Sequence, residues 1–185
     1  MTLGAWLGRE EVGARERVLG SVVSVLVGSA LLALATRVEI PFWPVPLNMQ
    51  TFVVLTLGLI YGPALGLATV LTYIAEGLAG LPVFAHGGGP AYIAGPTGGY
   101  LIGFAAAAWT AGQLAHRGWL RNPVTAVAAA LIANIVVYLF GVSWLAVVLG
   151  DAGKAVAVGL TPFLLGAALK VTGAGLLAHA FDRWR

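Results

Sequence analysis

The last apolar segment of the chain contains a lysine, and this residue restricts the possible folds more than any other feature. Residues 162–181 form a predominantly apolar run with Lys170 near its middle. At a rise of about 1.5 Å per residue, a helix of roughly 20 residues crosses the hydrocarbon core of a bilayer. An ammonium group at that depth is costly unless it faces protein, water or an anion. We therefore predict that Lys170 belongs to a buried polar site. The alternative is a structural lysine that reaches the nearer interface or a partner subunit.

The composition identifies an integral membrane protein. Hydrophobic residues make up 59% of the 185 residues and charged residues 9%, and the mean hydropathy is +0.93. Soluble domains carry about 25% charged residues. The net charge of +3 comes from basic residues at the ends of apolar segments, not from a cluster on a soluble face, so we expect no nucleic-acid partner. The absence of cysteine excludes disulfides and thiolate chemistry.

Six apolar segments predict an all-α membrane protein with a six-transmembrane-helix bundle over residues 18–185, forming a single substrate-binding domain in the lipid bilayer. The segments are 18–36, 50–61, 64–81, 101–115, 123–149 and 162–181. Residues 1–17 are rich in charge and lack a cleavage site, which predicts a cytosolic N-terminal tail. Small residues recur along the first segment, and such spacing favours either packing inside the chain or contact with a partner helix.

The distribution of basic residues predicts the orientation in the membrane. Cytoplasmic loops carry an excess of lysine and arginine. With both termini cytoplasmic in a bacterial inner (plasma) membrane, Arg37 and Lys154 lie outside. The residues then placed inside are Arg9, Arg15, Arg17, Arg117, Arg121, Arg183 and Arg185. This topology brings three connections together on the outer side: the proline-rich 40–47, the glycine-rich 82–100 and the segment around Asp151. We expect these loops to close an outward-facing pocket towards which Lys170 points.

The sequence contains no recognisable catalytic set. It lacks H-E-x-x-H, G-x-S-x-G and the phosphate-binding G-x-x-x-x-G-K-[ST], so we expect no enzyme activity and no cofactor. We expect no metal site either, because His86 has no second ligand at a suitable spacing. Amides and hydroxyls are left to accompany Lys170 in a binding site. They are Asn48, Gln50, Thr97, Tyr100 and Tyr138, the last on the same face as Asn134. Such a pocket suits a small, partly apolar ligand with amide-like or carboxylate groups.

Three segments resemble the BioY family, the biotin-binding S components of energy-coupling-factor (ECF) importers. They are IPFWPVPLNMQT (40–51), GLPVFAHGGGPAYIAGPTGGYLIGF (80–104) and GLTPFLLGAALK (159–170). The resemblance extends over nearly the whole membrane part. It implies a six-helix bundle that captures biotin from outside and associates with an ECF coupling transmembrane protein and two ATP-binding subunits. Those subunits would explain why this chain has no nucleotide motif.

The resemblance also implies roles for individual residues. Lys170 matches a family lysine that contacts the ureido ring of biotin, and Gln50 matches the glutamine of a PVP-x-x-x-Q-T segment. Relatives commonly have the pattern P-G-D-x-x-K, which ends in that lysine. Ala167 stands at the position of its aspartate here. This difference implies rearranged contacts to the ureido ring.

Further assignments follow from the same resemblance. His86 stands in place of an asparagine of the outer loop, and Tyr100 with loop N–H groups is expected to meet the biotin carboxylate. In the first segment, Ser29 and Ala33 resemble the A-x-x-x-A surface with which S components meet their coupling subunit.

A second function class is a self-sufficient secondary carrier or channel for a small organic solute. In that hypothesis Glu76 and Lys170 form a coupling pair within the membrane. Rapid gradient-driven uptake by the chain alone would favour it, whereas binding without uptake favours the S component. An intramembrane enzyme is a third reading, but the sequence offers no nucleophile for it.

Overall fold

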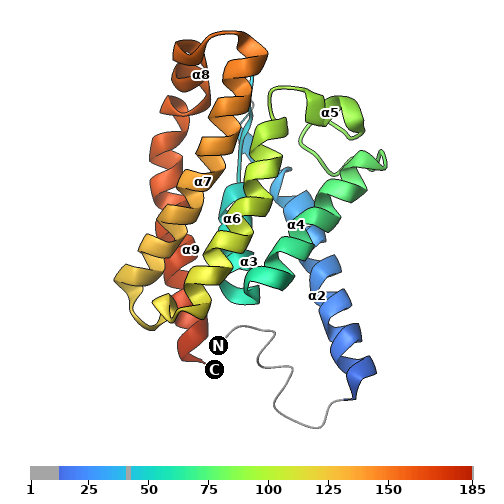
Figure 1. Ribbon diagram of the computed structural model, residues 1–185, viewed down its shortest axis with the longest axis vertical. Coiled ribbons are helices and arrows are strands. Elements are labelled where there is room, and N and C mark those ends of the chain that lie inside the picture. The colour runs from blue at the N-terminus through green and yellow to red at the C-terminus, as the bar shows by residue number, and fades with distance from the viewer. Residues whose placement is uncertain (1–12, 41–42, 185) are drawn as a thin grey trace.

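The protein is an all-α helical bundle, as predicted. The computed structural model describes residues 13–40 and 43–184 (Figure 1). The longer helices are α2 (Ala14–Ala35), α3 (Gln50–Tyr61), α4 (Pro63–Leu78), α6 (Gly98–His116), α7 (Pro123–Leu149) and α9 (Leu164–Arg183). Shorter elements in the connections are α5 (Pro90–Ala94), η1 (Trp119–Arg121), α8 (Ala152–Gly159) and η2 (Thr161–Phe163). Two short strands, β1 (Glu39–Ile40) and β2 (Leu47–Asn48), pair antiparallel within the proline-rich connection.

Helix length and hydropathy support a membrane protein. Among the described residues, three segments are long and apolar enough to cross a bilayer: Arg15–Ala35, Pro123–Leu149 and Ala152–Arg183. Helices α3 and α4 are apolar but have 12 and 16 residues, fewer than the roughly 20 that a perpendicular span needs. A membrane helical bundle is therefore supported, and six complete spans stay a prediction.

Glycine and proline determine where several helices begin and end. Gly62 separates α3 from α4 with a φ of +84°, a conformation that residues with a side chain rarely adopt. Pro63 follows in the first turn of α4, where its missing N–H is not needed. Asn122 caps α7, and its side-chain oxygen accepts a hydrogen bond from the N–H of Val124 at 2.8 Å. The predicted boundaries at Gly62 and Pro123 are confirmed.

Small residues let the central helices approach closely. A Cβ added at Gly112 of α6 would lie 2.3 Å from the nitrogen of Pro63, and one at Gly58 of α3 would lie 2.7 Å from the carbonyl oxygen of Ala108. Buried alanines fill the inner faces of α6 and α7. Lipid tails are as apolar as leucine, so helices in a membrane associate through such close packing. Helix α6, which packs on α3, α4 and α7, is the centre of the bundle.

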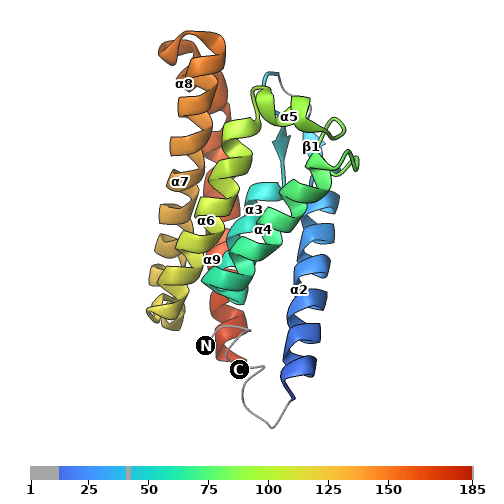
Figure 2. The same ribbon diagram turned by 45° about the vertical axis from the view of Figure 1, so that its right-hand side comes forward.

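Helix α2 lies at one side of the bundle and packs mainly on α4. Its N-terminal half leans away from the other helices (Figures 1 and 2). A Cβ at Gly28 would lie 2.6 Å from Thr69 Cγ2, so the two helices nearly touch there. Ser29 is fully buried, and its hydroxyl donates a hydrogen bond to Glu76 Oε2. The partner-surface prediction therefore does not match the position of Ser29, which serves packing inside the chain. Ala33 is partly buried against the core.

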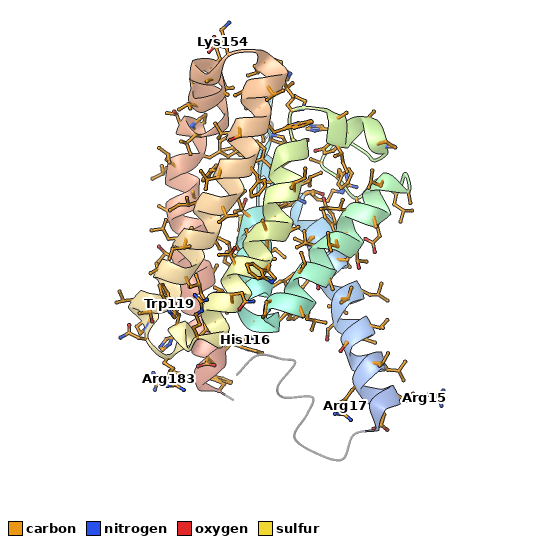
Figure 3. All side chains as sticks on the ribbon, in the orientation of Figure 1. Arg15, Arg17, His116, Trp119, Lys154 and Arg183 are labelled. Atoms are coloured by element: carbon orange, nitrogen blue, oxygen red, sulfur yellow. The ribbon has the colours of Figure 1, made fainter. Side chains whose placement is uncertain are left out.

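The two ends of the bundle differ in charge. Figure 3 shows Arg15, Arg17 and Arg183 at one end and Lys154 at the other. We call these the arginine end and the loop end, and the loop end carries the β1–β2 sheet, α5 and α8 (Figure 2). Because α2 begins at Ala14, residues 14–17 of the predicted tail belong to a helix. Residues 1–12 of that tail lie outside the described residues.

Candidate ligand-binding pocket

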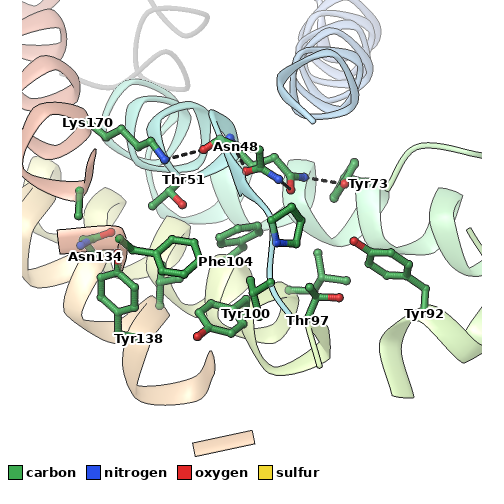
Figure 4. A pocket seen from close by; sticks show the side chains of 17 residues that line it. Asn48, Thr51, Tyr73, Tyr92, Thr97, Tyr100, Phe104, Asn134, Tyr138 and Lys170 are labelled. Carbon is green, nitrogen blue, oxygen red and sulfur yellow. Dashed lines mark hydrogen bonds between the residues drawn. The ribbon is translucent and has the colours of Figure 1, made fainter. Parts of the chain in front are cut away.

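A pocket lies at the loop end, bounded by five helices, the β2 segment and α5 (Figure 4). Its lining residues are Val45, Pro46, Asn48, Gln50, Thr51, Tyr73, Tyr92, Thr97, Tyr100, Leu101, Phe104, Asn134, Val137, Tyr138, Phe163, Ala167 and Lys170. The cavity measures about 40 Å³. Cavities that hold small organic ligands measure roughly 300–1,000 Å³. The walls must therefore separate before such a ligand can enter.

The amine of Lys170 faces this pocket. Its Nζ donates a hydrogen bond of 2.5 Å to the backbone carbonyl oxygen of Asn48, at the end of β2 (Figure 4). The amine therefore meets the protein interior and does not reach for an interface. Lys170 also lies nearer the loop end than the sequence suggested. Thr161 to Phe163 form η2 and α9 begins only at Leu164, so Lys170 belongs to the second turn of the helix.

Two amides and a tyrosine form a hydrogen-bonded wall opposite the α7–α9 side. Asn48 Nδ2 donates to Gln50 Oε1 at 2.9 Å, and Gln50 Nε2 donates to the hydroxyl of Tyr73 at 2.6 Å. The Tyr73 hydroxyl in turn donates to the carbonyl oxygen of Val83 at 3.1 Å. This chain of bonds links β2, α3 and α4 to the connection that follows α4. Tyr73 could not be singled out from the sequence, because only tertiary packing brings α4 beside Gln50.

Other predicted hydroxyls line the pocket as well. Tyr100 is buried, and its hydroxyl donates to the carbonyl oxygen of Gly159 at 2.8 Å. Thr97 and Tyr92 of α5 both line the pocket, and burial raises the pKa of the Tyr92 hydroxyl, which stays neutral at pH 7. Tyr138 completes the set on α7. The structure thus brings together Lys170 and the five amide and hydroxyl residues that the sequence suggested.

Asn134 lies beside Tyr138 in the pocket wall, although the predicted site did not include it. Its side chain is buried, with 3% of its surface exposed. Its Oδ1 has no hydrogen-bond partner within the described chain. The spacing of four residues from Tyr138 already indicated a shared helix face, and this was the one available sequence signal.

Two other predicted residues lie elsewhere. The His86 side chain is 60% exposed and outside the pocket lining, with its Nε2 3.8 Å from Glu39 Oε1. Glu76 faces Ser29 of α2 and not the pocket. The coupling pair of Glu76 and Lys170 that a secondary carrier would use is therefore not formed in the described structure. No group of three potential metal ligands occurs among the described residues.

The fold and the pocket define a class: a membrane-embedded helical bundle that surrounds a small site of mixed polarity at one end. A sequence model of the BioY family matches residues 10–185. The chain therefore belongs to the BioY family.

Individual relatives and a solved structure agree with this assignment. A probable biotin transporter of Pyrococcus horikoshii is 38% identical over 160 residues, which cover 86% of this chain and 93% of the relative. The biotin transporter of Thermotoga maritima is 36% identical over 152 residues, covering 81% and 88%. The crystal structure of an S-component for biotin from an ECF-type ABC transporter matches with a TM-score of 0.83 at 22% identity, covering 93% of this chain and 95% of that one. At this identity the structural match shows a shared fold.

Proposed function

We propose that this chain takes up biotin as the membrane-embedded, biotin-binding S component of an ECF-type importer. Membership of a family whose relatives carry the name biotin transporter supports the ligand. The observation that carries the proposal in this chain is the Lys170 ammonium, which faces a pocket of mixed polarity. A buried donor beside apolar walls suits a ligand that combines an apolar body with a few polar groups.

The pocket contacts suit the parts of biotin in a definite way. The ureido carbonyl accepts a hydrogen bond from Lys170, which gives up its bond to the carbonyl oxygen of Asn48. The bicyclic ring and aliphatic chain pack against Phe104, Val137 and Phe163, which line the pocket. The carboxylate extends towards Tyr100 and the N–H groups of the loop end.

The small cavity implies that binding is coupled to movement of the loops. The wall that contains Asn48, Gln50 and Tyr73 is held by side-chain hydrogen bonds, and these can be exchanged for bonds to a ligand. The connection after α4 is tied to the same wall through Val83. Biotin therefore enters when the β1–β2 and α5 segments move outward, and it is enclosed when they return.

The charge distribution supports an orientation with the arginine end in the cytoplasm and the pocket open to the outside of a bacterial inner membrane. All six longer helices then cross the bilayer, with α3 and α4 as short, packed spans. We propose a coupling transmembrane protein and two ATP-binding subunits as partners. Uptake would need them, because the sequence has no phosphate-binding loop of its own.

Equilibrium binding tests the proposal. Purified chain in detergent should bind biotin with submicromolar affinity, measured by calorimetry, and should bind biotin methyl ester more weakly. Failure to bind biotin below micromolar concentration would overturn the proposed ligand.

A second experiment separates the S component from the carrier. Proteoliposomes that contain this chain alone should bind biotin without accumulating it. Gradient-driven accumulation without ATP-binding subunits would instead establish a secondary carrier.

A further inference from the structure

Asn134 differs from the other amides and the lysine of the pocket, because its side-chain oxygen has no partner in the described chain. Lys170, Asn48, Gln50 and Tyr73 all hydrogen-bond within the protein. Asn134 Oδ1 is fully buried and unpaired. Buried polar atoms in proteins nearly always have a partner, since an unmet bond is costly. An unpaired acceptor in the wall of a ligand pocket therefore indicates a bond to the ligand.

Asn134 and Tyr138 lie four residues apart on one face of α7, so their side chains are neighbours in the pocket wall. Figure 4 shows Asn134, Tyr138 and Lys170 at one side of the pocket, with Tyr73 and Tyr92 at the other. The acceptor and the ammonium group thus belong to the same part of the pocket.

The pocket can also grow in the direction of Asn134. A hollow of about 640 Å³ lies between α7 and α9 and opens at the surface of the bundle. Asn134, Tyr138 and Ala167 line both this hollow and the pocket. Ala167 contributes only a methyl group to the shared wall. A ligand that widens the pocket towards α7 and α9 therefore meets Asn134 directly.

We propose that Asn134 is a specificity-determining residue of the biotin site, and that its Oδ1 accepts a hydrogen bond from a ureido N–H of biotin. This inference rests on the proposed function. A ureido group presents a carbonyl acceptor and N–H donors on the same ring. Lys170 can serve only the carbonyl, because an ammonium group has no acceptor. The described lining residues include no carboxylate, and the side-chain oxygens of Asn48 and Gln50 already accept bonds. Among the side-chain amide oxygens of the described lining, Asn134 Oδ1 is the one that is unpaired.

The test compares variants and ligands together. Asn134→Leu keeps the size of the side chain and removes the acceptor, so biotin affinity should fall about 10–100-fold, since a ligand N–H is left buried without a partner. Asn134→Asp keeps an oxygen at the same place and should stay within about fivefold of the wild type. Ser143→Ala is the matched control, because Ser143 is on the same helix and lines the hollow but not the pocket.

Two biotin analogues, each methylated at one ureido nitrogen, identify the contact. Wild-type protein should bind one of them about 10–100-fold more weakly than biotin, and Asn134→Leu should show little further loss with that analogue, because the two changes remove the same bond. The inference would be overturned if methylation weakened binding equally in wild type and Asn134→Leu, or if Asn134→Leu bound biotin as tightly as the wild type does. The proposed function would stand in both cases. If Asn134→Leu does not fold, wild-type protein that binds both analogues as tightly as biotin would overturn it. If the wild type does not bind biotin at all, both the proposed function and this inference are wrong.

Discussion

The arginine end of the bundle and the β2–α3–α4 wall of the pocket are held together by different kinds of contact. At the arginine end, the backbone of α6 touches the turn between α3 and α4 at Gly112 and Pro63. At the loop end, the pocket walls meet through hydrogen bonds between side chains such as Gln50 and Tyr73. Backbone contacts cannot widen without losing packing on both sides, whereas polar contacts can be exchanged for contacts to a ligand. The pocket wall of Asn48, Gln50 and Tyr73 is therefore the part that can exchange its contacts, on a more tightly packed base.

Gly112→Ala disturbs the close packing at the arginine end and should have the largest effect on the stability of the protein. The new methyl group would lie 2.3 Å from Pro63 N and 2.5 Å from Gly62 C, both of them backbone atoms that cannot yield easily. We expect a loss of about 3 kcal/mol in the free energy of unfolding, at the upper end of overpacking effects. Denaturant unfolding of the purified protein in detergent measures it.

Gly166→Ala is the matched control in α9, because a Cβ there meets no atom within 4 Å. The same substitution at this half-buried but uncrowded position should stabilise the protein by about 0.5–1 kcal/mol. Equal changes in both variants would show that the close approach at Gly112 does not limit stability.

Lys170→Met tests the loop end and should affect ligand binding more than folding. The methionine keeps most of the apolar length but removes the donor, so biotin affinity should fall about 10–150-fold, the value of a hydrogen bond from a charged group. Lys154→Met is the control, because the Lys154 side chain is 75% exposed on α8 and does not line the pocket. Calorimetry measures both dissociation constants.

Biotin methyl ester shows which end of the ligand Lys170 contacts. If the ammonium group binds the ureido carbonyl, esterification should weaken binding equally in wild type and Lys170→Met. A penalty that disappears in the variant would instead place Lys170 at the carboxylate.

Tyr73→Phe should have an intermediate effect on the hydrogen-bonded wall. The change removes the bonds to Gln50 and to the carbonyl oxygen of Val83, and leaves the buried amide of Gln50 with an unmet donor. We expect a loss of about 1–2 kcal/mol of stability and faster dissociation of biotin, because the connection after α4 is released. Unfolding and stopped-flow dissociation measure the two effects. Tyr61→Phe is the control, since the hydroxyl of Tyr61 bonds to no other residue of the described chain. If the dissociation rate of biotin is unchanged in Tyr73→Phe, the hydrogen bonds of this wall do not control the release of biotin.

Much of this architecture was predictable from the sequence, and the remainder was not, for a physical reason. The lengths of apolar runs and the positions of Gly62 and Pro123 predict the helices and their order. Lys170 is conspicuous because a charge within an apolar run needs a partner. In lipid, however, the outer face of a helix is as apolar as its inner face, so periodicity does not show which residues turn inward. This is why Ser29 could be assigned to a surface although it is buried, and why Tyr73 was missed. The path of the glycine-rich connection depends on backbone conformations at Gly87 and Gly89, and it leaves His86 outside the pocket.

Ser29→Ala tests the contact between α2 and the fixed part of the bundle, and it should have the smallest effect. The hydroxyl donates to Glu76, so its loss should cost about 1 kcal/mol of stability or less, and biotin affinity should not change because neither residue lines the pocket. If Ser29 instead belonged to a partner surface, the variant would keep full stability and co-purify less of the proposed coupling subunit. A moderate loss of stability with unchanged co-purification would place the partner surface elsewhere on α2, where Val23 and Leu34 are exposed on the outer side. Since α2 packs mainly on α4 and its N-terminal half leans away, that outer side is free to meet a partner without disturbing the pocket.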